Sequence, residues 1–363
     1  MLTLSGRNGE YGGPVRVARE LCSELNSRGQ STHIFSGAIA GSEPIARAGL
    51  LESFVIVKPV SKRYSVSSYW NLKVISSLNQ LIKKSEIVHI HFARDLISFV
   101  AATLSILANK PFVAQTHGMV IPDERRFTKI LDFCFTKPLI NRAHANLVLN
   151  ANEEEKMMAL GVKSKIVILS NGISISNSRE KPRSKTKIVI FCSRLNKRKG
   201  IEKFIQLADI SKELGLKFEI YGPDGGELDF ITNHIREKKL DKIIEYGGSL
   251  SIDQVQEVLA KSDLLILPSK DEPFPMIVLE SLAMGTPVMI DQTCGIETSI
   301  RAIDKNFVVN SSDIEEMQVK MRKILLKYEE KEAQKRLVDK ANKCFSISNV
   351  CDDYLRVVGN FLK

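Results

Sequence analysis

The sequence has no apolar run long enough to cross a membrane. Its longest one, residues 96–108, is 13 residues long and is broken by Thr103 and two serines, whereas a membrane-spanning helix needs about 20 apolar residues. We therefore expect a buried helix there. Arg7 and Glu10 interrupt any early apolar core, so no secretion signal is predicted and we expect the protein to stay in the cytosol.

Patterns for metals, disulfides and nucleic acids are also missing. None of the six cysteines forms a Cys-x-x-Cys pair, so the spacing favours neither zinc nor a disulfide framework, and we expect buried free thiols. There is one tryptophan and there are seven tyrosines, and none is interleaved with the basic run that follows residue 187. Without stacking residues or a recognition-helix pattern, we expect no nucleic-acid partner.

What the sequence does have is positive charge, unevenly placed. The formal net charge of +10 divides into +8 for residues 1–178, +4 for residues 179–187 and −2 for residues 188–363. A basic first half suggests contact with something anionic, such as phospholipid head groups or a lipid-linked diphosphate. A solvated basic surface that keeps the protein soluble is the alternative explanation.

Short apolar runs alternate with amphipathic stretches in both halves, which is typical of parallel strands connected by helices. In the first half we predict strands at 1–4, 32–36, 54–58, 87–91, 112–116, 145–149 and 165–169, and helices at 14–28, 68–83, 96–108, 124–142 and 152–160. In the second half we predict strands at 187–192, 217–221, 243–246, 263–267, 287–290 and 306–309, and helices at 201–214, 227–238, 252–261, 276–284, 314–328, 330–342 and 349–362.

The polar, basic stretch 174–187 lacks periodicity and contains Pro182, so we interpret it as a linker. The sequence thus predicts an α/β protein of two doubly wound, Rossmann-like domains. The domains are expected at 1–173 and 188–345, and a closing helix at 346–363. Sheets of this kind bind ligands beyond the carboxyl ends of their strands.

A glycine-rich segment, N-G-E-Y-G-G-P at residues 8–14, lies between the first predicted strand and helix. Glycines such as Gly13 let the backbone approach a phosphate, and the helix end offers free N–H groups. The match to G-x-G-x-x-G is imperfect, and no well-placed acidic residue follows the second strand, so a dehydrogenase is poorly supported. A simple turn is the alternative.

A basic segment, S-R-L-N-K-R-K-G at residues 193–200, follows a predicted strand directly and precedes a helix. Arg194 can bind phosphate in a bidentate manner, and Lys199 adds a mobile point charge. The position favours a diphosphate site. The alternative is a solvated basic turn.

Two carboxylates, Glu272 and Glu280, flank the segment E-P-F-P-M-I-V-L-E. The prolines keep its first part extended, and a helix is expected to start near Pro275, so first-turn N–H groups would lie near Glu272. Carboxylates accept hydrogen bonds from the vicinal hydroxyls of a ribose or hexose. Acids that merely favour the helix dipole are the alternative.

His117 ends a predicted strand and precedes Gly118. A lone histidine is more often structural, but this position favours a functional one. We interpret His89 and His91, which lie within a strand, as structural.

Taken together, these motifs resemble the retaining glycosyltransferases of family 4, which have the GT-B fold. The likeness extends over nearly the whole chain and rests on the following motifs: G-G-P-V-R at 12–16, T-H-G at 116–118, N-G-I at 171–173, S-R-L-x-x-x-K-G at 193–200, E-x-F-P-x-x-x-L-E at 272–280 and A-x-G-T-P-V at 283–288.

The resemblance implies a role for each candidate residue. Arg194 and Lys199, helped by the backbone near Gly13, would hold the diphosphate of a nucleotide-sugar donor, and Glu280 would bind its ribose. Glu272 would hold the donor sugar with the amides around Phe274, Met276 and Ile277, and His117 would lie by the reacting sugar and assist orientation or charge. Neither a cofactor nor a metal is implied, because the two cations replace the metal.

The resemblance also implies an acceptor-binding first domain, a nucleotide-sugar-binding second domain across a cleft, and a last helix that packs back on the first domain. Together with the charge, it implies a glycan or lipid-linked acceptor of bacterial surface polysaccharide synthesis and an anionic membrane surface. Two other functions stay open. One is a nucleotide-sugar epimerase of the same architecture, and the other is a non-enzymatic binder of anionic ligands.

Overall fold

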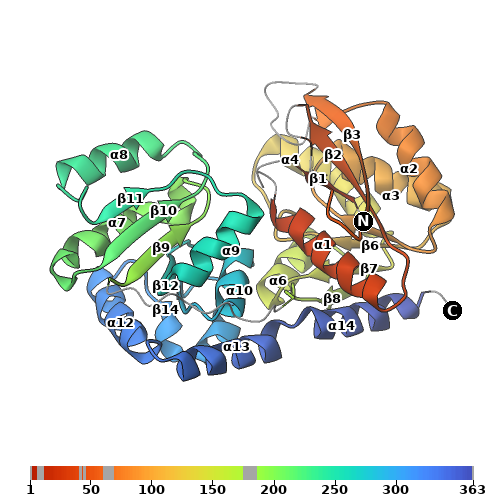
Figure 1. Cartoon of the computed structure of the whole chain (residues 1–363). Coiled ribbons are helices and arrows are strands. Elements are labelled where there is room, and N and C mark those ends of the chain that lie inside the picture. The colour runs from red at the N-terminus through yellow and green to blue at the C-terminus, as the bar shows by residue number, and fades with distance from the viewer. Residues whose placement is uncertain are drawn as a thin grey trace. The chain divides into compact units, whose positions relative to one another are not determined.

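A computed structural model describes residues 2–5, 12–40, 43, 46–59, 69–174 and 186–361. The chain divides into two compact units, which are described separately (Figure 1). Unit 1 comprises Met1–Gly172 and Ile347–Lys363, and unit 2 comprises Ile173–Ser346. Most of the predicted linker, residues 175–185, lies outside the described residues.

Unit 1 contains an eight-stranded sheet in the order β4-β3-β2-β1-β5-β6-β7-β8. Neighbouring strands are parallel except for β3 and β4. Strand order reverses between β1 and β5, and ligands of doubly wound sheets bind at such a switch point. The strands are β1 (Leu2–Ser5), β2 (His33–Ile39), β3 (Leu51–Pro59), β4 (Tyr69–Trp70), β5 (Val88–His91), β6 (Phe112–Gln115), β7 (Ala145–Val148) and β8 (Ile166–Ile168).

Helices cover this sheet, and one of them comes from the far end of the chain. Helix α14 packs beside α1 and adds Ile347, Cys351 and Tyr354 to a core that α1 builds with Leu21 and Leu25. The helices of unit 1 are α1 (Gly12–Ser27), α2 (Lys73–Lys84), α3 (Leu96–Leu107), α4 (Arg126–Leu131), α5 (Lys137–Ile140), α6 (Ala151–Leu160) and α14 (Ile347–Gly359).

Unit 2 contains a six-stranded parallel sheet in the order β11-β10-β9-β12-β13-β14. Its switch point lies between β9 and β12, because β10 and β11 extend the sheet one way and β13 and β14 the other. The strands are β9 (Ile188–Cys192), β10 (Lys217–Tyr221), β11 (Ile244–Tyr246), β12 (Leu264–Leu267), β13 (Val288–Asp291) and β14 (Val308–Val309).

The helices of unit 2 form two groups around this sheet (Figure 1). Helix α7 packs beside α12, and α10 packs beside α9 and α13. The helices are α7 (Ile201–Ile210), α8 (Leu228–Glu237), α9 (Ile252–Lys261), α10 (Met276–Ala283), α11 (Glu297–Ile303), α12 (Ile314–Lys327) and α13 (Lys331–Phe345). Both units are therefore Rossmann-like α/β folds, as the alternation of strands and helices predicts.

The predicted elements differ from the structure at three places. The helix predicted at 68–83 begins only at Lys73, because Tyr69 and Trp70 pair with β3 instead. The helix predicted at 124–142 is interrupted by a π-helical turn at Asp132–Thr136. Helix α11 was not predicted, since its seven residues give too short a period to recognise.

Cysteine burial was predicted correctly at four positions and wrongly at two. Cys22, Cys192, Cys294 and Cys351 are buried free thiols, whereas Cys134 and Cys344 are exposed. The apolar run predicted as a buried helix is α3, in which Ile97, Phe99 and Ala101 are buried.

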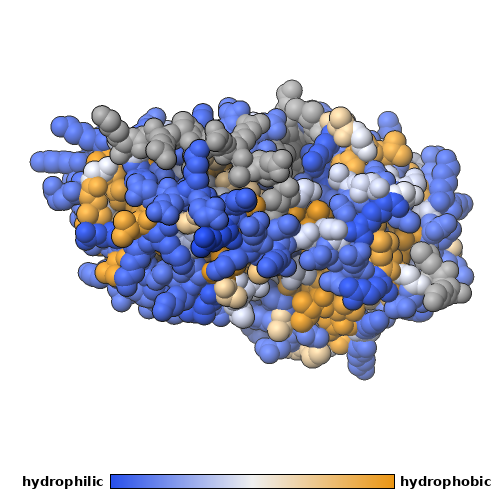
Figure 2. All heavy atoms as spheres, turned by 60° about the horizontal axis from the view of Figure 1, so that its bottom comes forward, coloured by the Kyte–Doolittle hydropathy of each residue, from blue (hydrophilic) through white to orange (hydrophobic). Residues whose placement is uncertain are grey.

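Apolar residues lie mainly in these cores, and Figure 2 shows hydrophilic side chains over most of one face, with separate clusters of hydrophobic ones. Within the described ranges, no helix combines the length and the apolar character that crossing a membrane requires.

Candidate functional site

Three candidate residues of unit 2, Arg194, Lys199 and Glu272, lie after the two strands at its switch point. Arg194 and Lys199 follow β9, and Glu272 follows β12, the strand paired with β9. Because β9 and β12 are parallel neighbours, their carboxyl ends and both loops lie at the same edge of the sheet. The chain order thus places cations and carboxylates together.

Lys199 and Glu272 form an ion pair at this edge. Lys199 Nζ lies 2.6 Å from Glu272 Oε2, and the two side chains are 22% and 18% exposed. This partial burial strengthens the pair relative to one at the open surface and leaves both groups within reach of solvent. Arg194, in the same loop, is exposed.

Close backbone packing holds the two loops against each other. Gly200 has a φ of 73°, and a Cβ built on it would lie 2.5 Å from the carbonyl oxygen of Pro268, so the close approach requires glycine. Ser269 Oγ donates a hydrogen bond of 3.3 Å to the carbonyl oxygen of Lys199. These contacts fix the start of the Lys199 side chain relative to the loop that carries Glu272.

Helix α10 extends the site from Glu272. It begins at Met276 with Pro275 as its N-cap, and the N–H groups of Met276 and Ile277 lie in the first turn, where a helix has no internal acceptor for them. Phe274 is buried, and so is Glu280 within the helix. Burial raises the pKa of the Cys192 thiol, at the end of β9, to about 12, and the charge of Glu280 adds to the rise.

In unit 1, His117 lies just beyond β6 in an uncommon backbone conformation with a φ of 50°. The buried carboxylate of Glu153, on α6, binds both residues that flank it. Glu153 Oε1 accepts hydrogen bonds from Thr116 Oγ1 at 2.6 Å and from the N–H of Gly118. Glu153 Oε2 accepts one from the N–H of Leu149 at 2.7 Å. The left-handed geometry of His117 is thus held from both sides.

The imidazole of His117 contacts a second histidine. His91 Nδ1 lies 2.6 Å from His117 Nε2, and the two rings stack with centroids 4.9 Å apart. Burial lowers the pKa of His117 to about 3 and lowers the pKa of His91 well below its usual value. Desolvation thus favours the neutral form of both rings at neutral pH.

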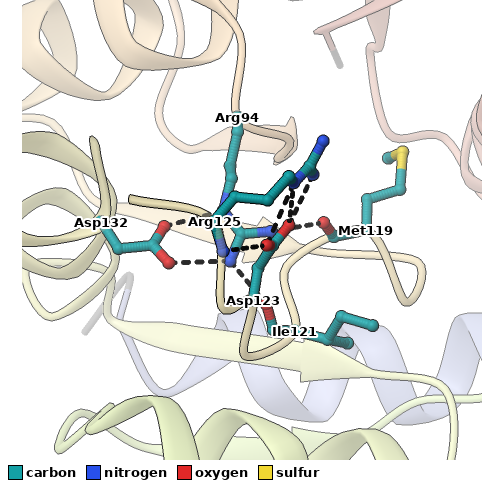
Figure 3. A network of polar contacts seen from close by, with 6 residues as sticks. All are labelled: Arg94, Met119, Ile121, Asp123, Arg125 and Asp132. Carbon is teal, nitrogen blue, oxygen red and sulfur yellow. Dashed lines mark hydrogen bonds and ion pairs between the residues drawn. The ribbon is translucent and has the colours of Figure 1, made fainter. Parts of the chain in front are cut away.

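Arg94 organises the loop that follows His117 (Figure 3). It follows β5 and binds Asp132 through two hydrogen bonds of 2.7 and 2.9 Å. It also donates to the carbonyl oxygens of Met119 and Ile121 at 3.1 and 2.6 Å. One cation therefore ties this loop to the π-helical turn.

Sequence reasoning missed Glu153, His91 and Arg94. Glu153 fell within the helix predicted at 152–160 without a role of its own, and His91 was interpreted as structural, because their partners lie 35 and 26 residues away in the chain. The His-x-His spacing of residues 89 and 91 in a strand was the available signal, since it places both rings on one face of the sheet.

Most of the glycine-rich segment lies outside the described residues. Residues 8–11 of the glycine-rich segment lie outside the described residues, and a Cβ on Gly13 would meet no described atom within 4 Å. In the part of the chain that the structure describes, no three His, Cys, Asp or Glu residues cluster as metal ligands.

Two family models match the chain and together span residues 11–343. The model described as Glycosyltransferase Family 4 matches residues 11–177, and the model described as Glycosyl transferases group 1 matches residues 174–343. The border between the two matches lies close to the border between units 1 and 2.

Two curated relatives resemble this chain over different lengths. N-acetyl-alpha-D-glucosaminyl L-malate synthase of Bacillus anthracis is 22% identical over 321 residues, which are 83% of this chain and 81% of that protein. Alpha-galactosylglucosyldiacylglycerol synthase of Streptococcus pneumoniae is 26% identical over 166 residues, which are 41% of this chain and 44% of that protein. The second match thus spans less than half of that relative.

Solved structures share the fold over nearly the whole chain. Anabaena Alr3699/HepE in complex with UDP and glucose superposes with a TM-score of 0.75 at 15% identity and 99% coverage of both chains. A glycosyltransferase from Rickettsia africae has a TM-score of 0.72 at 17% identity, with 100% of this chain and 98% of that chain covered. From the two family models and this shared fold, the chain is a glycosyltransferase of the GT-B type.

Proposed function

We propose that the chain transfers a hexose-type sugar from a nucleoside-diphosphate sugar to an acceptor and retains the anomeric configuration. The ion pair of Lys199 and Glu272 at the switch point of unit 2 carries this proposal. It sets a cation suited to a diphosphate beside a carboxylate suited to sugar hydroxyls.

The leaving diphosphate gains negative charge as the bond to the sugar breaks. Arg194 and Lys199 would bind its oxygens and stabilise that charge where it develops. Because these two cationic side chains would supply the positive charge, the proposed reaction needs neither a metal ion nor a cofactor. In this account Lys199 exchanges part of its contact with Glu272 for the diphosphate.

The carboxylates would hold the rest of the donor. Glu272 would accept hydrogen bonds from the sugar hydroxyls, together with the N–H groups around Phe274, Met276 and Ile277, and Glu280 would bind the ribose. Pro275 has no N–H, so one contact to the sugar that another residue could make is missing, and this should affect the choice of donor. We propose that His117 contacts the reacting sugar, and that the backbone near Gly13 assists the diphosphate.

UDP-sugars are the first donors to test. Anabaena Alr3699/HepE was crystallised with UDP-glucose, and Staphylococcus aureus TarM was crystallised with UDP. These ligands belong to those proteins, but the shared fold supports testing their chemistry here first.

We further propose an acceptor that is a lipid-linked glycan of bacterial surface polysaccharide synthesis, met on the inner face of an anionic membrane. The segment formed by α4 and the π-helical turn supports this. Phe127, Ile130 and Phe133 are 54%, 62% and 78% exposed. Two exposed cations are adjacent to them in the chain, since Arg126 precedes Phe127 and Lys129 precedes Ile130. Apolar side chains beside cations are suited to anionic head groups.

A panel of UDP-, GDP- and ADP-sugars tests the donor. At a fixed concentration, a donor that binds more tightly raises the melting temperature more, and the stabilising sugar is then incubated with glycan acceptors. The proposal predicts a glycoside with the donor's anomeric configuration. An isomerised nucleotide sugar formed without acceptor would instead show an epimerase, and stabilisation by any polyanion without turnover would show a non-enzymatic binder.

Sedimentation with phosphatidylglycerol vesicles tests the membrane surface. We expect binding that salt reverses and that Ile130→Glu with Phe133→Glu weakens. Leu326→Glu is the matched control, because Leu326 is an equally exposed apolar residue, at 76%, on α12 of unit 2. Equal sedimentation of wild type and the double variant would refute this surface.

A further inference from the structure

The contact between His91 and His117 contains only one hydrogen. His91 Nδ1 and His117 Nε2 lie 2.6 Å apart, so one nitrogen must donate and the other must accept. A neutral imidazole carries a hydrogen on only one nitrogen. The direction of this hydrogen bond therefore fixes the tautomer of both rings.

The surroundings of His91 decide the direction. His91 Nε2 is buried without a hydrogen-bond partner. If His91 Nδ1 accepted, Nε2 would carry an N–H donor buried without an acceptor, which costs the full desolvation of that donor. If His91 Nδ1 donates, Nε2 is a bare acceptor, which is less costly. His91 Nδ1–H therefore donates to His117 Nε2.

The hydrogen of His117 is then on its other nitrogen, Nδ1. His117 is only half-buried, so Nδ1 is the ring nitrogen left for a ligand. Its position is fixed, because Glu153 holds Thr116 and Gly118 on either side of it. The low pKa of both rings agrees with neutral imidazoles.

We propose that His91 is a positioning residue that fixes His117 in the Nδ1–H tautomer, so that His117 presents a neutral hydrogen-bond donor to an oxygen of the bound substrate. The role toward substrate rests on the proposed glycosyl transfer, whereas the tautomer does not. The two parts are therefore tested separately.

Nitrogen NMR of ¹⁵N-histidine-labelled protein tests the tautomer without substrate. In the wild type at neutral pH we expect a pyrrole-type signal for His117 Nδ1 and a pyridine-type signal for Nε2. His91→Phe should abolish this preference, and His91→Asn, whose amide can donate from the place of Nδ1, should restore it.

His89→Phe is the matched control. His89 is buried and stacks on His91 with ring centroids 4.7 Å apart. It does not stack on His117 itself, so the signals of His117 should stay unchanged in this variant. A pyridine-type Nδ1 for His117 in the wild type would overturn the inference, and this reading needs no variant to fold.

Turnover of the donor found in the panel tests the role toward substrate. His117→Asn keeps a donor at the place of Nδ1 and should retain kcat within about tenfold, whereas His117→Gln moves the donor and should lose about a hundredfold, as for a lost positioned donor. The reverse order, or wild-type turnover in both, would overturn this role while leaving the tautomer to the NMR result.

Discussion

At the scale of single residues, three imidazoles and a phenol form a stacked row inside unit 1. His89 lies between His91 and Tyr354, with ring centroids 4.7 and 5.4 Å away, and His117 stacks on the other side of His91. Burial lowers the pKa of His89 to about 3 and raises the pKa of Tyr354. The row is therefore uncharged at neutral pH.

This row predicts that acid destabilises the fold. In the unfolded chain His89 has a pKa of about 6.5, whereas in the folded chain its pKa is about 3. Between these two values only the unfolded chain binds the proton, so the free energy of unfolding decreases as the pH falls through this window. At pH 5 the loss from His89 is about 2 kcal/mol. Urea unfolding should therefore show that the free energy of unfolding of His89→Phe, relative to that of the wild type, increases by this amount between pH 7 and pH 5. An equal pH dependence of the two proteins would contradict the low pKa of His89.

Single-residue roles were predictable from the sequence only where both partners follow strands. Lys199 and Glu272 could be placed near each other because each lies just beyond the end of a buried strand, and such ends share an edge. Glu153 and His91 could not, because an acid in a first helical turn and a histidine in a strand have ordinary local explanations. Only the packing of α6 and β5 around Thr116–Gly118 distinguishes them.

At the scale of elements, the strands were predicted to within three residues at nearly every end. Strands such as β6, β7 and β12 are buried throughout, so each gives a continuous apolar run. Strand β4 has two residues and is defined only by its pairing with β3. Pairing with a distant strand determines β4, so no local sequence pattern predicts it.

The loop between β9 and α7 predicts a glycine-specific effect. Gly200→Ala adds left-handed strain and a clash with the Pro268 carbonyl, only 2.5 Å away, so it should destabilise unit 2 by more than the roughly 1–2 kcal/mol of strain alone. Gly215→Ala is the control, since Gly215 has a φ of 66° and open space. Urea midpoints of the two variants measure the difference, and equal midpoints would show that the loops are not in close contact.

Helix α14 comes from the end of the chain, and we predict that it stabilises the core of unit 1. Tyr354 is 4% exposed in the core shared with α1, so Tyr354→Ala should cost about 3–5 kcal/mol, as for a large buried aromatic side chain. Arg356→Ala on the same helix should stay within about 0.5 kcal/mol, because the Arg356 side chain is 78% exposed. Thermal unfolding of both variants tests this, and similar losses would mean that α14 contributes little to unit 1.

At the scale of the whole molecule, this chain shares its fold with proteins that have few of the same residues. The Anabaena protein covers 99% of this chain at 15% identity, since many sequences can alternate buried strands with amphipathic helices. What the alternation does not specify is the donor or the acceptor. These depend on a few loop side chains at the strand ends, such as Pro273 and Pro275.

The most direct measurement of the central claim is the turnover of Lys199→Ala with the nucleotide sugar that binds the wild type. Loss of a positioned charge beside the leaving diphosphate should lower kcat about a hundredfold or more, or about 3–4 kcal/mol, with the melting temperature nearly unchanged. Arg198→Ala, which removes an exposed cation from the same turn, should lose far less. Wild-type turnover in Lys199→Ala would contradict the account.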